Sequence, residues 1–216
     1  MPELNFTKVL LWLPAVIIAL SFHEYAHGKT ADWLGDPTPR YQGRLTLNPF
    51  QHIDPLGFLL LLFAGFGWAK PVQVNPLNFR GDRRKGMMLV ALAGPLMNLL
   101  VAFTGALIMS LALPDQMAIT SVHPLVGILR GIMIINVYLA LFNLIPVPPL
   151  DGAKVLTGIF PSYELISSRL EAYGPIILLI LIFTRFIEMV ILPLAAFIIK
   201  LISLIAQSLA LLFTGF

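Results

Sequence analysis

Long apolar runs separated by short polar segments are the dominant pattern of this chain. Three runs, residues 9–28, 87–113 and 125–150, approach or exceed the roughly 20 apolar residues that a helix needs to cross a bilayer. Another run, residues 56–69, has only about 14 residues and contains three glycines, which favours a re-entrant or interfacial segment. The pattern therefore predicts three spanning helices with one shorter membrane-associated segment between the first two.

The last apolar run, residues 175–216, is too long for one simple span. Arg185, Glu188 and Lys200 interrupt it. It can form a helical hairpin or one span with an interfacial tail, and Pro193 is a candidate kink.

Residues 36–78 differ from the rest because they are rich in proline, glycine, asparagine and β-forming residues. This composition predicts short strands or a hairpin at the membrane surface. The expected fold is an all-α polytopic membrane protein, a helical bundle with a short re-entrant or β-like surface segment. We expect one intramembrane domain over residues 1–216, with a core at about 9–155 and a C-terminal hydrophobic segment at about 175–216.

Composition supports a membrane as the solvent. Hydrophobic residues make up 58% of the chain and charged residues only 12%, about half the charge of a soluble domain. The net charge of +3 comes without a basic stripe interleaved with aromatic residues, which argues against a nucleic-acid partner. The absence of cysteine excludes disulfides, thiolate metal ligands and a cysteine nucleophile.

The basic residues predict the orientation. Eight of the fourteen lysine and arginine residues lie between Lys29 and Lys85. The loop at residues 114–124 has no lysine or arginine, and its one charged residue is Asp115. By the positive-inside rule, the long first loop and the region of Asp151 are cytoplasmic and the Asp115 loop faces out. Two spans then bring their polar ends to the same side of the membrane.

The sequence His23-Glu24-Tyr25-Ala26-His27 ends the first apolar run. On a helix, residues four apart lie on one face, so both imidazoles can bind one cation. Neutral imidazole suits zinc, and the adjacent Glu24 can take a proton from a zinc-bound water. Ionisable residues at membrane depth are costly, which favours a functional role over a polar helix end reaching toward the headgroups.

A third protein ligand is needed, and His52, Asp54 and Asp151 are the candidates on the same predicted side. Asp151 is the best of them because it follows a long apolar run and a proline-rich, irregular backbone that membranes tolerate around a wet cavity. A carboxylate that caps the following helix is the alternative role for Asp151. Spacing alone does not choose between ligand and cap.

Several further motifs accompany the histidine pair and together cover about residues 20–155. They are His-Glu-Tyr-Ala-His-Gly at 23–28, Gly-Arg-Leu-Thr-Leu-Asn-Pro at 43–49, His-Ile-Asp-Pro at 52–55, Gly-Trp-Ala-Lys-Pro-Val at 67–72, Ala-Gly-Pro-Leu-Met-Asn at 93–98, and Phe-Asn-Leu-Ile-Pro-Val-Pro-Pro-Leu-Asp-Gly at 142–152. With this set the chain resembles the site-2 protease family of intramembrane zinc metalloproteases. The resemblance is to the small prokaryotic type without a PDZ or CBS domain.

The resemblance implies one zinc ion held by His23, His27 and Asp151, with Glu24 as general base and acid. It also implies that Asn143 lies near the metal and helps to hold the substrate or the oxyanion. Gly94 would let the third segment pack closely against the catalytic helix, a role that membrane-helix physics also favours for a small residue.

The predicted function is hydrolysis of peptide bonds in transmembrane substrates, as in regulated intramembrane proteolysis. The predicted partners are a transmembrane protein substrate and the lipid bilayer. The predicted location is a prokaryotic cell membrane, with the active site toward the cytoplasm. There are two alternative functions. A membrane transporter would bind the metal with the same residues without hydrolysis, and a membrane scaffold would bind no metal.

Overall fold

A computed structural model describes residues 6–64, 67–112 and 124–214 of the chain. All regular elements in these ranges are helices, so the predicted all-α polytopic membrane fold is confirmed. In order they are α1 (Phe6–Trp33), α2 (Thr38–Tyr41), η1 (Pro49–Gln51), α3 (Pro55–Ala64), η2 (Pro76–Asn78), α4 (Arg83–Ala112), α5 (Pro124–Asn143), α6 (Asp151–Ile159), α7 (Tyr163–Glu171), α8 (Gly174–Phe183) and α9 (Phe186–Thr214). The predicted outward loop around Asp115 lies outside the described residues.

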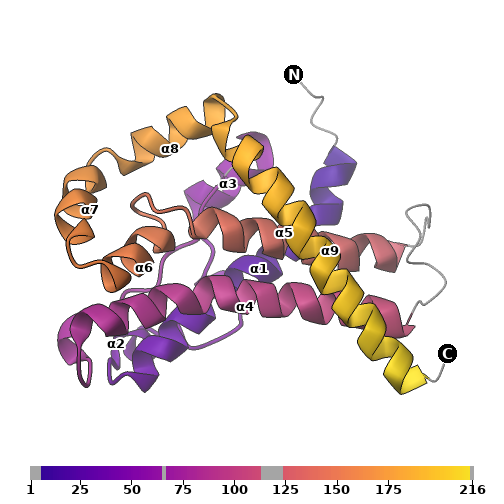
Figure 1. Cartoon of the computed structure of the whole chain (residues 1–216), viewed down its shortest axis with the longest axis horizontal. Helices are drawn as coiled ribbons and strands as arrows, with labels where there is room; N and C mark the ends of the chain where they lie inside the picture. Colours follow the sequence, from indigo (N-terminus) through magenta and orange to yellow (C-terminus); the bar gives the residue numbers. More distant parts are fainter. Residues whose placement is uncertain (1–5, 65–66, 113–123, 215–216) are drawn as a thin grey trace.

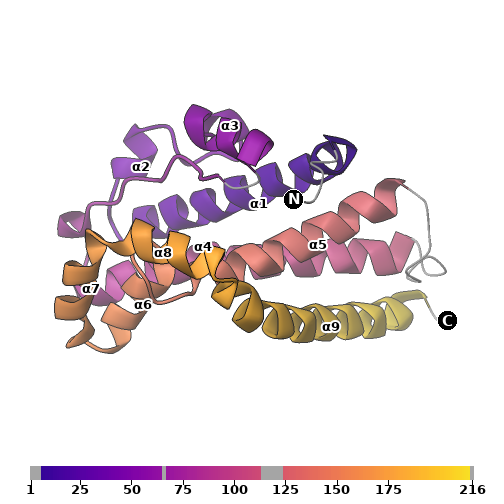
Figure 2. The ribbon, with the colours of Figure 1, turned by 90° about the horizontal axis from the view of Figure 1, so that it is seen from above.

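Four long helices, α1, α4, α5 and α9, form the bundle (Figure 1). Three of them, α4, α5 and α9, are long and apolar enough to cross a membrane. The first predicted span forms α1, whose 28 residues extend about 40 Å at 1.5 Å per residue. Seen from above, the short α3 lies outside the bundle on the side of α1, and α6 and α7 gather at one end (Figure 2).

Small residues bring α4, α5 and α9 close together. Ala102 and Ala106 of α4 meet Val137 of α5 and Ala195 and Ala206 of α9 in one fully buried cluster. Helices in lipid gain little from apolar contact alone, so close backbone approach and van der Waals packing hold such an interface. This cluster therefore holds α4, which packs against the polar site described below, close to α5 and α9.

Of the two alternatives predicted for residues 36–78, short strands or a hairpin at the membrane surface, the described residues do not form the strands. In the described part of this segment the strand-like pairing is a single antiparallel bridge, Ile53 to Ala69. Asn48 and Asn75 instead accept a hydrogen bond from the backbone N–H two residues later, and each starts a 3₁₀ turn whose first residue is proline. Proline lacks an N–H for a ladder, so these positions favour turns over strands. At 10 residues, α3 spans only about 15 Å and is too short to cross the bilayer.

The C-terminal run divides at Thr184 and Arg185 rather than at Pro193. Arg185 has a φ of 56° and separates α8 from α9, whereas Pro193 lies within α9. Before this break, α7 and α8 meet at a bend of 82°. The run therefore provides one long membrane helix, α9, preceded by the shorter α8.

Candidate active site

The two histidines of α1 meet at one point. The His23 and His27 Nε2 atoms lie 2.9 Å apart, with the two rings nearly perpendicular at 88°. Both side chains are buried. One helical turn separates the two residues, so the helix itself supplies this pairing.

Asp151 completes the group from another part of the chain. Helix α5 ends at Asn143, a proline-rich turn reverses direction, and Asp151 is the first residue of α6. Its Oδ2 lies 3.2 Å from the Nε2 atoms of both His23 and His27. The close approach of Gly152 to the carbonyl groups of Leu144 and Ile145 leaves no space for a Cβ, so glycine at 152 permits this turn. The carboxylate thus faces the histidines, which favours the ligand role over the helix-cap role.

The ligand atoms of these three buried residues lie within 4.8 Å of one another, the arrangement of a metal site. Hydrogen bonds on the far side of each ring determine which nitrogen carries the proton. The His27 Nδ1–H donates to the Val90 carbonyl oxygen at 2.7 Å, and the His23 Nδ1–H donates to the Asn98 Oδ1 at 2.6 Å. The Nε2 atoms therefore present lone pairs toward the centre of the group.

The donor set fits a cation. Two Nε2 lone pairs and a carboxylate face one another, and the buried Asp151 Oδ2 accepts no hydrogen bond from the described residues. Buried polar atoms normally have a hydrogen-bond partner. A carboxylate that faces two imidazole lone pairs finds no donor there, so a bound cation is the partner that would satisfy it. Two imidazoles and one carboxylate form a three-ligand set used by catalytic zinc, which leaves one position open.

Gly94 of α4 makes room for this group. A Cβ at this position would lie 2.5 Å from the His27 Nε2 and 2.6 Å from the His23 Cε1. Such contacts are closer than packed atoms allow, so only glycine lets α4 approach both rings. This agrees with the close-packing role expected for Gly94.

Glu24 shares a cavity of about 340 Å³ with the three residues. Its Oε2 accepts a hydrogen bond from the Val72 backbone N–H at 2.9 Å. Residues 71–74 line this cavity, and the Lys70 N–H bonds to the His52 carbonyl oxygen at 2.8 Å. The turn at His52 therefore holds the extended segment that orients the Glu24 carboxylate.

Asp36 anchors the other end of that segment. It is fully buried, and its carboxylate accepts hydrogen bonds from the Asn75 N–H at 2.7 Å and the Asn78 side-chain amide at 2.8 Å. Burial raises the pKa of Asp36, but hydrogen bonds from Thr38, Asn78 and Asn75 outweigh it and lower the pKa below its usual value. Asp36 is thus held as a carboxylate that fixes the segment beside Glu24.

The remaining candidates have other positions. Asn143 lines the cavity, but its Nδ2 donates to the Leu139 carbonyl oxygen of its own helix at 3.0 Å. His52 is buried and bonds to the Thr46 carbonyl oxygen at 2.7 Å, while Asp54 accepts from the Gly57 N–H at the start of α3. Neither His52 nor Asp54 belongs to the metal-site group, so both act as loop-structuring residues here.

Sequence reasoning missed two partners of the site. The Val72 amide left no sequence signal, because a backbone N–H is present at every residue except proline. Asn136 is an asparagine inside a span, and its Oδ1 accepts from the Asn98 Nδ2 at 2.8 Å. A polar residue within an apolar run was the available signal, since such residues are costly in lipid.

The fold and the site define a polytopic membrane protein with a buried site suited to a metal ion. The profile of "Peptidase family M50" matches residues 110–185, which include Asp151. The "Putative zinc metalloprotease YwhC" of Bacillus subtilis is 40% identical over 173 residues, 78% of each chain. The chain belongs to peptidase family M50, the site-2 protease family.

Two further relatives are more distant. The "Putative zinc metalloprotease MJ0611" of Methanocaldococcus jannaschii is 30% identical over 72% of this chain and 73% of its own. The "Putative zinc metalloprotease Rip2" of Mycolicibacterium smegmatis is 27% identical over 81% of this chain and 67% of its own. No solved structure gives a significant match.

Proposed function

We propose that this protein is a zinc-dependent endopeptidase that hydrolyses peptide bonds of transmembrane substrates within the bilayer. The observation that carries the proposal is the convergence of His23, His27 and Asp151 in one buried cavity with Glu24. The names of the relatives, zinc metalloproteases, agree with this chemistry. We assign the three converging residues as the zinc ligands and the His-Glu-Tyr-Ala-His sequence as the catalytic motif.

Zinc bound by such a set supplies a Lewis acid and lowers the pKa of a coordinated water to about 7. Glu24 receives the proton of the attacking water and passes it to the leaving amine. Its Oε2 is engaged with the Val72 N–H, so we assign proton transfer to Oε1. Asn143 can donate to the carbonyl oxygen of the substrate once its amide leaves the Leu139 carbonyl.

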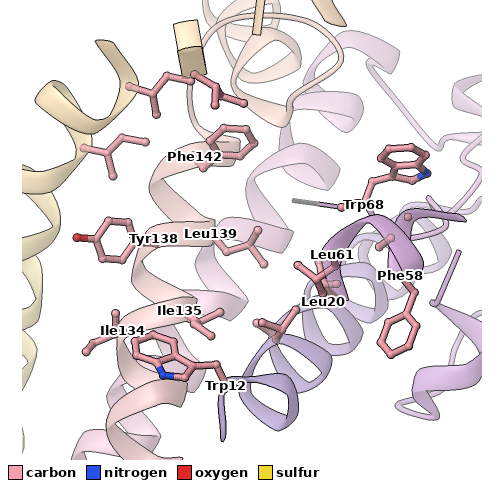
Figure 3. A pocket seen from close by; sticks show the side chains of 18 of the residues that line it. Trp12, Leu20, Phe58, Leu61, Trp68, Ile134, Ile135, Tyr138, Leu139 and Phe142 are labelled. Carbon is pink, nitrogen blue, oxygen red and sulfur yellow. The ribbon is translucent and has the colours of Figure 1, made fainter. Parts of the chain in front are cut away.

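An apolar cavity of about 820 Å³ beside the site suits a transmembrane substrate. Residues of α1, α3, α5 and α9 line it, and Leu20, Leu61 and Leu139 point into it from opposite sides (Figure 3). The chain continues from this lining into the metal site at Phe142–Asn143 and within one helical turn from Leu20 to His23. We therefore assign this cavity to the apolar segment of the substrate, which must unwind locally to expose a peptide bond to Glu24.

Filling the apolar cavity tests this assignment. We expect Leu139→Trp to slow cleavage of a membrane-anchored substrate by about tenfold, because a bulky ring occupies the space of the substrate. Zinc content is expected to stay unchanged. Leu204→Trp on α9 is a matched control, since Leu204 is 51% exposed and lies outside the cavity. Equal cleavage by both variants, measured in the same proteoliposomes, would remove this cavity from the substrate path.

Zinc binding tests the site itself. Detergent-purified wild-type protein is expected to contain one zinc per chain, and Asp151→Ala to lose most of it, because two imidazoles alone are a weak site. Glu171→Gln is the control: Glu171 is an exposed carboxylate on α7 that lies outside the metal-site group, so its loss should leave the zinc content unchanged. Metal analysis of the three proteins distinguishes the proposal from a metal-free scaffold, for which the wild type holds no stoichiometric zinc.

The location follows from charge and from the relatives. The basic segment between Lys29 and Lys85 directly follows His27 and supplies residues 71–74 of the cavity that holds Asp151, which supports an active site near the cytoplasmic face. Bacterial and archaeal relatives support a prokaryotic cell membrane. Regulated intramembrane proteolysis, in which a membrane-anchored protein is released by cleavage, is the process we propose for this enzyme.

A further inference from the structure

Two buried asparagines on neighbouring helices form a chain of hydrogen bonds that ends at His23. Asn98 of α4 and Asn136 of α5 are both fully buried. The Asn98 Oδ1 lies 2.6 Å from the His23 Nδ1, and the Asn98 Nδ2 lies 2.8 Å from the Asn136 Oδ1. The Asn136 Nδ2 in turn lies 2.8 Å from the Ile132 carbonyl oxygen. These contacts connect the backbone of α5 to an imidazole of α1 through α4.

In each of these hydrogen bonds, only one of the two groups can be the donor. A backbone carbonyl accepts and cannot donate, so the Asn136 amide must turn its NH₂ toward Ile132 and its oxygen toward Asn98. Asn98 must then use its NH₂ toward Asn136 and toward the Ala19 carbonyl oxygen, which lies 3.0 Å away. Its oxygen is left facing His23 and can only accept. The proton of the neutral His23 ring is therefore required on Nδ1.

This direction matters because the ring has an attractive alternative. A proton on the His23 Nε2 would face the His27 Nε2 at 2.9 Å and the Asp151 Oδ2 at 3.2 Å, and both can accept it. In that tautomer the lone pair needed for a metal points away from the site. Partners behind a ligating histidine fix its tautomer and its orientation, and their loss typically costs about 10–100-fold in metal affinity.

We propose that Asn136 is a positioning residue for the metal site: acting through Asn98, it keeps the proton of His23 on Nδ1 and so presents Nε2 to zinc. The effect on zinc binding rests on the proposed zinc function, whereas the effect on the His23 tautomer follows from the hydrogen bonds alone. Among the described residues, the Asn136 side chain bonds to Asn98 and to the Ile132 carbonyl oxygen and to none of His23, His27 and Asp151, so its influence passes through Asn98.

The test uses the full-length protein in detergent, with ¹⁵N-labelled histidine in the metal-free state and zinc affinity from competition with a chelator. The chain has four histidines, so the imidazole signals are few enough to assign, and ¹⁵N shifts distinguish the two tautomers. We expect Asn98→Ala to shift His23 toward the Nε2–H form and to weaken zinc binding by about 10–100-fold. Asn136→Ala is expected to cause a smaller shift in the same direction and a weakening of up to about tenfold, because the Ala19 carbonyl oxygen still holds the Asn98 amide.

The double variant provides the sharpest result. If Asn136 acts only through Asn98, the variant with both alanines binds zinc as weakly as Asn98→Ala alone, so the two effects do not add. Effects that add would overturn the relay. A wild-type tautomer and unchanged zinc affinity in Asn136→Ala would overturn the role of Asn136 altogether.

Two controls separate positioning from folding. Asn136→Asp, protonated at this buried site, donates to Ile132 and accepts from Asn98 as asparagine does, so a wild-type tautomer is expected. If Asn136→Ala fails to fold, the Asn136→Asp result decides the proposal, and an Nε2–H tautomer there would contradict it. Thr104→Val removes a hydroxyl of α4 that donates to the Leu100 carbonyl oxygen of its own helix, away from His23, and it should change neither measurement. A wild type that binds no zinc overturns the proposed function, while the tautomer measurement still decides the relay.

Discussion

Glu24→Gln is expected to reduce peptide-bond cleavage by about 10²–10⁴-fold, the usual contribution of a positioned general base. Glutamine keeps the size of the side chain and an oxygen that can accept from the Val72 N–H, so the local structure is retained. The amide has no basic oxygen for the proton of the attacking water. Zinc content is expected to remain at the wild-type level, because Glu24 is not among the converging ligands.

The measurement is cleavage of a membrane-anchored substrate by both proteins, with metal content determined on the same samples. Glu171→Gln is the matched control, because it makes the same chemical change at an exposed position on α7. A metal-binding transporter predicts a different pattern: Glu24→Gln would retain much of the zinc flux, and the wild type would show no cleavage. Full proteolytic activity in Glu24→Gln would refute the assigned general base.

Gly94→Ala is expected to weaken zinc binding by about tenfold or more and to reduce cleavage in parallel, because one methyl group displaces both imidazoles. The added Cβ would lie 2.5 Å from the His27 Nε2, so either α4 or the rings must move. Neighbouring groups restrict that movement: the Val90 carbonyl oxygen and Asn98 hold the two rings from the same helix. Alanine is intrinsically about 1 kcal/mol better than glycine in a helix, so helix propensity would not explain a loss.

Zinc titration and thermal unfolding of the purified variant check this result. Gly131→Ala on α5 is the matched control, since its Cβ would meet the Ala15 Cβ at 3.7 Å, an ordinary contact. If Gly94→Ala binds zinc as tightly as the wild type, α4 can move away from the histidines without a loss of zinc affinity. The close approach of α4 to the histidines would then be irrelevant to the metal site.

The site shows how a membrane bundle builds a reactive centre from a few polar groups. The histidine pair comes from α1, its hydrogen-bond partners from α4, the carboxylate from the first residue of α6, and the Glu24 partner from the surface segment at residues 71–74. In a low-dielectric interior each unpaired polar group is costly, so every member needs a defined partner. This explains why asparagines at positions 98 and 136 occur in otherwise apolar spans.

Sequence determined the helical membrane architecture of this protein. Lipid offers no hydrogen bonds to the backbone, so apolar runs of this length fold as helices whatever their neighbours. The His23 and His27 pair was equally predictable, because spacing by four places two residues on one face of any helix. The membrane helices and the histidine pair therefore depend only on the local spacing of residues and on the lipid that surrounds them.

Tertiary structure decided which distant groups join the pair. By sequence Asp151 was preferred over His52 and Asp54, but spacing alone left its role open between ligand and cap, and the reversal after α5 is what brings its carboxylate to the histidines. The turns in residues 36–78, the break at Arg185 and the bond from Asn136 to Asn98 likewise depend on contacts between segments far apart in the chain or on local turn chemistry that outweighs β-propensity. Long-range packing sets the choice of Asp151 and the bond between Asn136 and Asn98, because no single segment contains both partners. The turns at Asn48 and Asn75, in contrast, have their hydrogen-bond partners two residues away.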